Sequence, residues 1–142
     1  MKVEFTVPGK PLGKQRPRSG GGHRMYTPAP TVNYEMFVRE LYTRDCLDEN
    51  GKVQWFDDVP LRITIVAHML IPSSTSKVRK VKMLAGELKP TKKPDIDNIA
   101  KIILDGLNGV AYYDDKQVVE LYVEKKFGER EKVVVTIKEI EA

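Results

Sequence analysis

The amino-acid sequence predicts an α+β domain in which a mixed β-sheet of about four strands, ending in a C-terminal β-hairpin, packs against helices. Two observations support this fold class. Segments with the two-residue period of half-buried strands are interspersed with segments of helical period, and two strand-like segments follow each other at the C-terminus. A length of 142 residues fits one domain with its own core, so residues 1–142 are interpreted as a single domain.

The composition is that of a globular protein, with 41% hydrophobic and 31% charged residues. No apolar run approaches the roughly 20 residues that span a bilayer, and the first nine residues alternate instead of forming a signal peptide. We therefore expect a cytoplasmic protein with no membrane partner. Cys46, His23 and His68 are too few to form a zinc site, so any metal must bind to oxygen ligands.

The N-terminal segment is predicted to begin with a strand and continue as a basic arm. Residues 2–7 alternate between apolar and polar side chains, and Pro8-Gly9 ends this strand. Residues 10–30 contain four prolines and four glycines, which argues against regular structure and for a flexible loop. This arm has no acidic residue and carries five basic ones: Lys10, Lys14, Arg16, Arg18 and Arg24. Such a segment suits contacts with phosphate groups.

The middle of the chain predicts a helix, a strand and a short basic helix. Thr31 is a candidate N-cap for a helix that runs to about Asp48. Residues 61–69 alternate as a strand and stop before Pro72. The segment 73–76 then leads into a short helix around Val78 and Val81, and four basic residues lie within residues 77–82.

The last third predicts a helix from about Asp97 to Asn108, followed by a turn at Asp114-Asp115. Strands are expected over residues 118–126 and 133–140, joined at Gly128 as a hairpin.

Acidic residues gather at the start of the predicted helix and at the turn that follows it. Asp95 and Asp97 lie two residues apart at the helix entrance, where an extended chain points both carboxylates to one side. Asp97, Lys101 and Asp105 recur at intervals of four and share one exposed helix face. The chain between the end of this helix and Asp114-Asp115 is long enough for one of these two residues to approach that face.

This set of residues suits phosphodiester hydrolysis assisted by a metal. Magnesium prefers hard oxygen ligands and binds through few carboxylates together with water and phosphate. A bound metal makes water nucleophilic and neutralises transition-state charge, while Lys101 is placed to stabilise the same charge. Each acid also has an ordinary structural interpretation. Asp97 would cap the helix, Asp105 would pair with Lys101, and Asp114 and Asp115 would be turn residues.

The motifs resemble those of the RusA family of Holliday-junction resolvases, in particular its phage and prophage members. The resemblance rests on Pro94-Asp95-Ile96-Asp97-Asn98 with Lys101, on Asp105-Gly106-Leu107, and on residues 114–118. Residues 5–11, 14–18 and 26–28 also look like that family, whereas residues 46–89 give no match.

The resemblance implies a homodimeric enzyme that uses Mg²⁺, or Mn²⁺ in its place, to cut four-way DNA junctions by paired symmetric nicks in recombination and repair. It implies no small-molecule cofactor. By this resemblance the metal ligands are Asp95, Asp97 and Asp115, and Lys101 is the further catalytic residue. Asp114 and Asp105 are candidates for a supporting role beside these site residues. Predicted DNA contacts come from Lys14, Arg16, Arg18 and Lys93.

Two other functions compete with this interpretation. A catalytically silent module would bind the junction shape without cutting it. A hydrolase of small phosphate esters would ignore branched DNA, but a deep pocket for such a substrate usually needs a larger scaffold. Tyr112 and Tyr113 are expected to pack against the helix or to stack on an unpaired base, and neither histidine is placed as a general base.

Overall fold

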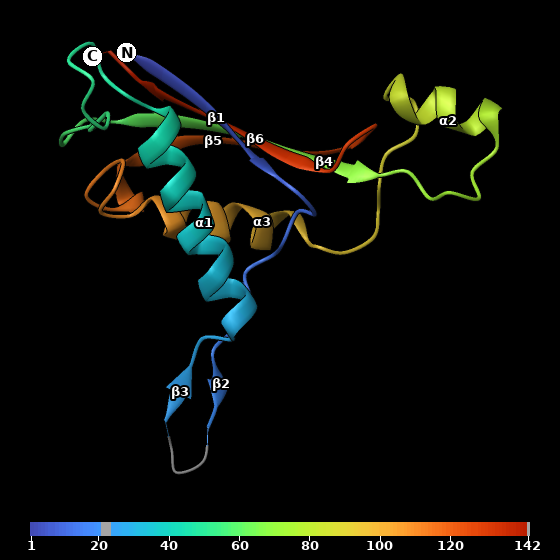
Figure 1. The fold of residues 1–142 in the computed structure, drawn as a ribbon, viewed down its shortest axis with the longest axis horizontal. Helices are drawn as coiled ribbons and strands as arrows, with labels where there is room; N and C mark the ends of the chain where they lie inside the picture. The colour runs from blue at the N-terminus through green and yellow to red at the C-terminus, as the bar shows by residue number, and fades with distance from the viewer. Residues whose placement is uncertain (21–23, 142) are drawn as a thin grey trace.

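The computed structural model describes residues 1–20 and 24–141 and shows one mixed sheet with two helices on a single face (Figure 1). Four long strands form the sheet in the order β1-β6-β4-β5. Their bounds are β1 (Lys2–Pro8), β4 (Leu61–Leu70), β5 (Val118–Gly128) and β6 (Lys132–Glu139). The helices are α1 (Ala29–Asp45), α2 (Lys77–Leu84) and α3 (Ile96–Leu107). The predicted α+β class and mixed sheet are confirmed.

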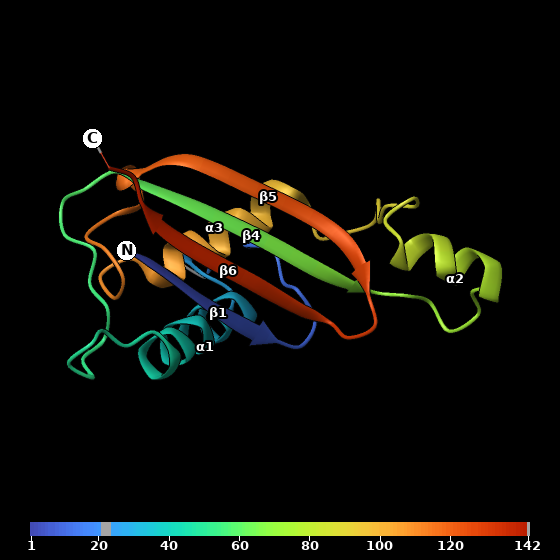
Figure 2. The same cartoon turned by 90° about the horizontal axis from the view of Figure 1, so that it is seen from above.

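The strand order separates the two C-terminal strands. β4 pairs in parallel with β5 on one side and antiparallel with β6 on the other. β5 and β6 are therefore consecutive and opposite in direction, as the predicted hairpin requires, but β4 lies between them (Figure 2). Alternation fixes which residues face the core. It does not determine which strands become neighbours.

The hydrophobic core lies between the sheet and the helices α1 and α3. α3 contributes one continuous apolar face, on which Ile99, Ile102, Ile103 and Leu107 are completely buried. The inward residues of β4 meet this face, since Leu61, Ile63, Ile65, Ala67 and Met69 are all buried. The opposite face is left to carry the polar residues, and Asp97 and Lys101 are exposed there as predicted.

The basic arm contains regular structure that was not expected. β2 (Arg18–Ser19) and β3 (Met25–Tyr26) form a two-residue antiparallel ladder. The prediction of an irregular loop over residues 10–30 is wrong there, because the backbone of Arg18–Ser19 pairs with that of Met25–Tyr26. Gly21, Gly22 and His23 lie outside the described residues.

The first helix begins and ends earlier than predicted. Pro28 is its N-cap residue, without a side-chain cap, and the proline at position 30 suits the first helical turn. Thr31 therefore does not cap the helix. It is buried, and its hydroxyl accepts a hydrogen bond from the Gln15 backbone N–H at 3.2 Å. The helix ends at Asp45 instead of about Asp48.

The short basic helix is present as α2, which lies beyond the C-terminal end of β4 and away from the other helices (Figure 2). Ser76 caps it by accepting a hydrogen bond from the Arg79 backbone N–H at 3.3 Å. Among the described residues, no helix has both the length and the apolar character needed to cross a membrane.

Candidate active site

The first acidic pair lies at the N-terminus of α3. Asp95 is the N-cap residue, but its side chain makes no cap hydrogen bond. Asp97 lies in the first turn, and its carboxylate accepts a hydrogen bond from the Asn98 backbone N–H at 3.0 Å. Both side chains are exposed. Negative charge is favourable here because the helix dipole presents its positive end, yet two exposed carboxylates exceed what one cap requires.

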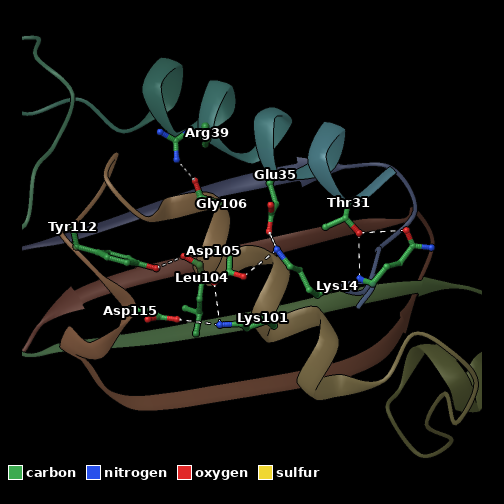
Figure 3. A network of polar contacts seen from close by, with 11 residues as sticks. Lys14, Thr31, Glu35, Arg39, Lys101, Leu104, Asp105, Gly106, Tyr112 and Asp115 are labelled. Atoms are coloured by element: carbon green, nitrogen blue, oxygen red, sulfur yellow. Dashed lines mark hydrogen bonds and ion pairs between the residues drawn. The ribbon is translucent and has the colours of Figure 1, made fainter. Parts of the chain in front are cut away.

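Lys101 links α3 to the turn that follows it (Figure 3). Its Nζ lies 3.2 Å from Asp105 Oδ1, one helical turn further along, and 3.7 Å from Asp115 Oδ2. Asp115 opens the short 3₁₀ helix η1 (Asp115–Gln117). The chain therefore does return to the polar face of α3, and the second acid of the later pair meets it at Lys101.

Lys14 extends this network into the base of the basic arm (Figure 3). Its Nζ lies 2.7 Å from Glu35 Oε2 on α1 and 3.1 Å from Asp105 Oδ2 on α3. The Lys14 side chain is only 20% exposed, and its two partners are 19% exposed. Lys14 thus already has two protein partners, whereas Arg16 and Arg18 of the same arm are exposed.

Asp114 has a structural role beside Asp115. Its side chain and that of Gln117 form a reciprocal capping box around η1. Gln117 is buried, its Oε1 accepts from the Tyr113 backbone N–H at 2.9 Å, and its amide donates to the Asp57 carbonyl at 2.7 Å. This arrangement fixes the turn that presents Asp115 to Lys101.

The charges of the site alter its acid–base properties. Hydrogen bonding to Asp105 and its charge, with a smaller contribution from Asp115, raise the pKa of Lys101. Its ammonium is therefore retained at neutral pH. Partial burial, and then the hydrogen bond with Asp114, raise the pKa of Asp115, while Lys101 opposes this shift. Lys101 therefore offsets only part of the effect of burial and of Asp114 on the Asp115 carboxylate.

The acids lie in two places along α3. Asp95 and Asp97 lie at its start, whereas Asp105 and Asp115 lie on either side of Lys101. Within residues 1–20 and 24–141, no three histidine, cysteine, aspartate or glutamate side chains form a group that could hold a metal ion. Asp97 and Lys101, four residues apart on one face, connect the two places.

The remaining predicted site residues occupy the periphery. Arg16, Arg18 and Lys93 are exposed. Tyr112 is buried and its hydroxyl donates to the Leu104 carbonyl at 2.8 Å, which confirms that it packs against the helix. Tyr113 is 60% exposed and lies edge-on to Trp55 with ring centroids 4.8 Å apart.

His68 lies on the sheet, on β4, in a strongly basic setting. Partial burial, followed by the charges of Lys132 and Lys126, lowers the pKa of His68. Its imidazole is therefore neutral at pH 7.

Glu35 is the site residue that the sequence interpretation missed. It lies 21 positions from Lys14 and 70 from Asp105, on a helix with no motif of its own. The available signal was the position of Glu35 one residue after Tyr34, beside the helix face that carries the apolar residues Tyr34, Val38 and Leu41.

Comparison with known proteins places most of the chain in one family match. The family model described as "Endodeoxyribonuclease RusA" matches residues 8–138. The Bacillus subtilis (strain 168) protein YqaN, described as uncharacterized, is 33% identical over 145 residues, which cover 99% of this chain and 98% of that protein. The matched region includes the arm, both acidic segments, Lys101 and the middle region that showed no motif.

Proposed function

The chain belongs to the RusA endodeoxyribonuclease family, and from this premise and its site we propose that it is a metal-dependent endonuclease that resolves four-way DNA junctions by paired nicks. The observation that carries the proposal is the position of Lys101. It shares a helix face with Asp97 and contacts Asp115 across the turn. A retained ammonium among acids, beside a basic arm, suits binding and cleavage of a phosphodiester.

Carboxylate oxygens are the ligands that a hard divalent cation prefers, although no three acidic side chains form a ready-made group within residues 1–20 and 24–141. Asp95 and Asp97 offer exposed carboxylates, for which no ion pair is found in the described part of the chain. Asp115 is undercompensated, and Mg²⁺ needs only a few carboxylates because water and phosphate complete its shell. We propose Asp95, Asp97 and Asp115 as the ligands of Mg²⁺, or of Mn²⁺ in its place.

The metal, when bound, would supply an acidified water and a positive charge at the scissile phosphate. The chain's own residues would do the rest. Asp105 holds the Lys101 ammonium, which would stabilise charge on the phosphate oxygens during cleavage. Asp114 would act by fixing the turn of Asp115, and not as a ligand. Arg16, Arg18 and Lys93 would hold the DNA backbone.

A homodimer completes the proposal. Two symmetric nicks need two active sites, and an isologous dimer presents the same patch to equivalent strands of a two-fold junction.

The test is cleavage of an end-labelled immobile four-way junction and a matched linear duplex, in Mg²⁺ or EDTA. The wild type should nick the junction in pairs, only with metal, and Asp97→Asn should abolish the nicks. Asp45→Asn is the matched control, since Asp45 is an exposed residue at the end of α1 whose one ion pair within the described part of the chain is with Arg44.

The other outcomes separate the rival functions. Tight junction binding without nicks in any metal would refute the nuclease and favour a shape-recognising module. Turnover of a small phosphate ester with no action on DNA would favour a small-molecule hydrolase. Mn²⁺ binding followed by electron paramagnetic resonance gives a readout that does not depend on cleavage, and Asp97→Asn should weaken it.

A further inference from the structure

A second basic segment, residues 77–93, lies between β4 and Asp95 in the sequence. This segment contains seven basic residues and one acidic residue, Glu87. With the arm, it holds twelve of the 24 basic residues and one of the 20 acidic residues, so the rest of the chain is net negative. The positive charge of this protein is thus concentrated in two segments.

α2 presents this charge on an exposed helix. Its four basic residues are all exposed, and they are Lys77, Arg79, Lys80 and Lys82. Val78 and Val81, one turn apart on the same face, are 69% and 67% exposed. Met83 is the buried residue of the helix, while the two valines lie on its exposed surface. Exposed apolar side chains flanked by cations are typical of a binding surface.

A groove runs between α2 and the β5–β6 connection. It has a volume of about 370 Å³. Lys77 and Lys80 line it together with the hydroxyl-bearing residues Ser73 and Thr75, and Glu129 is the one acid among its lining residues. Ammonium and hydroxyl groups at one place are the donors that contact phosphate oxygens in protein–DNA complexes.

The loop between α2 and α3 is held against the sheet. Lys89 Nζ lies 3.4 Å from Glu124 Oε2, and Lys125 Nζ donates to the Lys92 carbonyl at 2.6 Å. The connection therefore joins α2 to the acidic start of α3 along a defined path. In Figure 1, α2 and the β2–β3 ladder project from the body in different directions.

We propose that α2 and its groove form a second DNA-binding surface, which takes the phosphate backbone of one duplex arm of the branched substrate while the basic arm takes another. The inference rests on the proposed function. Charge complementarity selects the occupant: the surface is almost free of acid, and duplex DNA is a dense polyanion. The two exposed valines would contact the sugar edges of the same duplex, where an apolar surface is compatible with the grooves.

The test measures junction binding in EDTA by fluorescence anisotropy over a range of salt concentrations. The variant replaces Lys77, Arg79, Lys80 and Lys82 with glutamine. Each lost phosphate contact should reduce the slope of log affinity against log salt by about one, so a reduction of about two to four is expected. Affinity at about 0.1 M salt should fall on the order of 10-fold to 100-fold.

A matched control removes the same charge elsewhere. It replaces Lys2, Arg44, Lys52 and Lys138, which are exposed and lie outside both basic segments and away from the groove, with glutamine. Its salt slope should stay within about one of the wild type. An equal loss in both variants would show that only net charge matters and would overturn the proposal. Because the substituted side chains are exposed in both variants, circular dichroism should show both proteins folded.

A further variant, Val78→Ser with Val81→Ser, keeps all charges. It should weaken junction binding without changing the slope of log affinity against log salt.

The outcomes distinguish this inference from the proposed function. If the wild type binds and nicks the junction but the α2 variant keeps the same slope and affinity, the second surface is refuted and the nuclease stands. If the wild type binds no branched DNA, both fail. A variant that binds linear duplex like the wild type but loses junction affinity supports a contact with a second arm.

Discussion

Lys14 should stabilise the fold, because it places one cation between two largely buried carboxylates. Replacing it with methionine keeps the length and apolar stem of the side chain but removes the ammonium. Glu35 and Asp105, at 2.7 Å and 3.1 Å from Nζ and each 19% exposed, would then lose this partner. Asp105 keeps Lys101, whereas Glu35 keeps no cation among the described residues.

The magnitude follows from the geometry. A hydrogen bond to a charged group contributes about 1.5–3 kcal/mol, and the loss of one partner from a fully buried pair costs about 3–5 kcal/mol. Partial exposure screens part of this, so Lys14→Met should lower the free energy of unfolding by about 2–3 kcal/mol. Urea denaturation followed by circular dichroism measures it. The matched control is Lys10→Met in the same arm, where the side chain is exposed, and there the change should stay within about 0.5 kcal/mol.

The dependence on pH gives an independent check. Burial alone lowers the pKa of Lys14, but the hydrogen bonds and charges of Glu35 and Asp105 outweigh it, so the net pKa is raised above 10.5. The folded state therefore holds this proton more tightly, and the stabilisation is complete below pH 10.5 and lost as pH rises through the folded pKa. The wild type should lose this increment above pH 10.5 and Lys14→Met should not. Equal stability of the two proteins at pH 7 would refute the reasoning.

Three further predictions address the site and the core. Lys101→Gln removes the ammonium between its two aspartate partners, so the junction cleavage rate should fall about 100-fold with little change in binding; an equal loss of binding would contradict a transition-state role. Gly106→Val should lower the free energy of unfolding by about 1–3 kcal/mol in urea denaturation, because an added Cβ would already lie 3.2 Å from Val38; an unchanged midpoint would show that α1 can move away. Burial raises the pKa of Cys46 to about 11, so a disulfide reagent at pH 8 should react only after unfolding, and a comparable rate in the native protein would refute its burial.

Much of the fold could be predicted because local patterns encode it. The apolar stripe of α3 determined both a helix and its buried side, and alternation located the long strands to within two residues at each end. The order of strands is a different kind of information. β4 lies between β5 and β6 because of packing between distant segments, and no two-residue period records that choice.

The candidate site likewise contains some contacts that the sequence predicts and others that it does not. Asp97, Lys101 and Asp105 are related by helical spacing, so the sequence predicted their shared face, and the ion pair of Lys101 with Asp105 follows from it. The bridge from Lys14 to Glu35 could not be predicted, since it depends on how the arm enters the domain. The metal ligands and the DNA contacts remain predictions, which rest on the family and on the chemistry of carboxylates.

The base of the arm is fixed to the acidic helix, and under the proposed function this attachment would link DNA binding by the arm to the candidate active site. The Lys14 backbone N–H donates to the Asn98 carbonyl at 2.8 Å, and a Cβ on Gly13 would lie 3.0 Å from side-chain atoms of both Asn98 and Pro94. Only glycine fits there without displacing the start of α3. Arg16 follows three residues after Gly13, so a phosphate bound by Arg16 would be held at a defined position relative to Asp97. Residues 10–20 and 24–30 therefore combine an anchored base with a β2–β3 ladder that extends away from the domain, and under the proposed function the anchored base would set the register between DNA and the carboxylates.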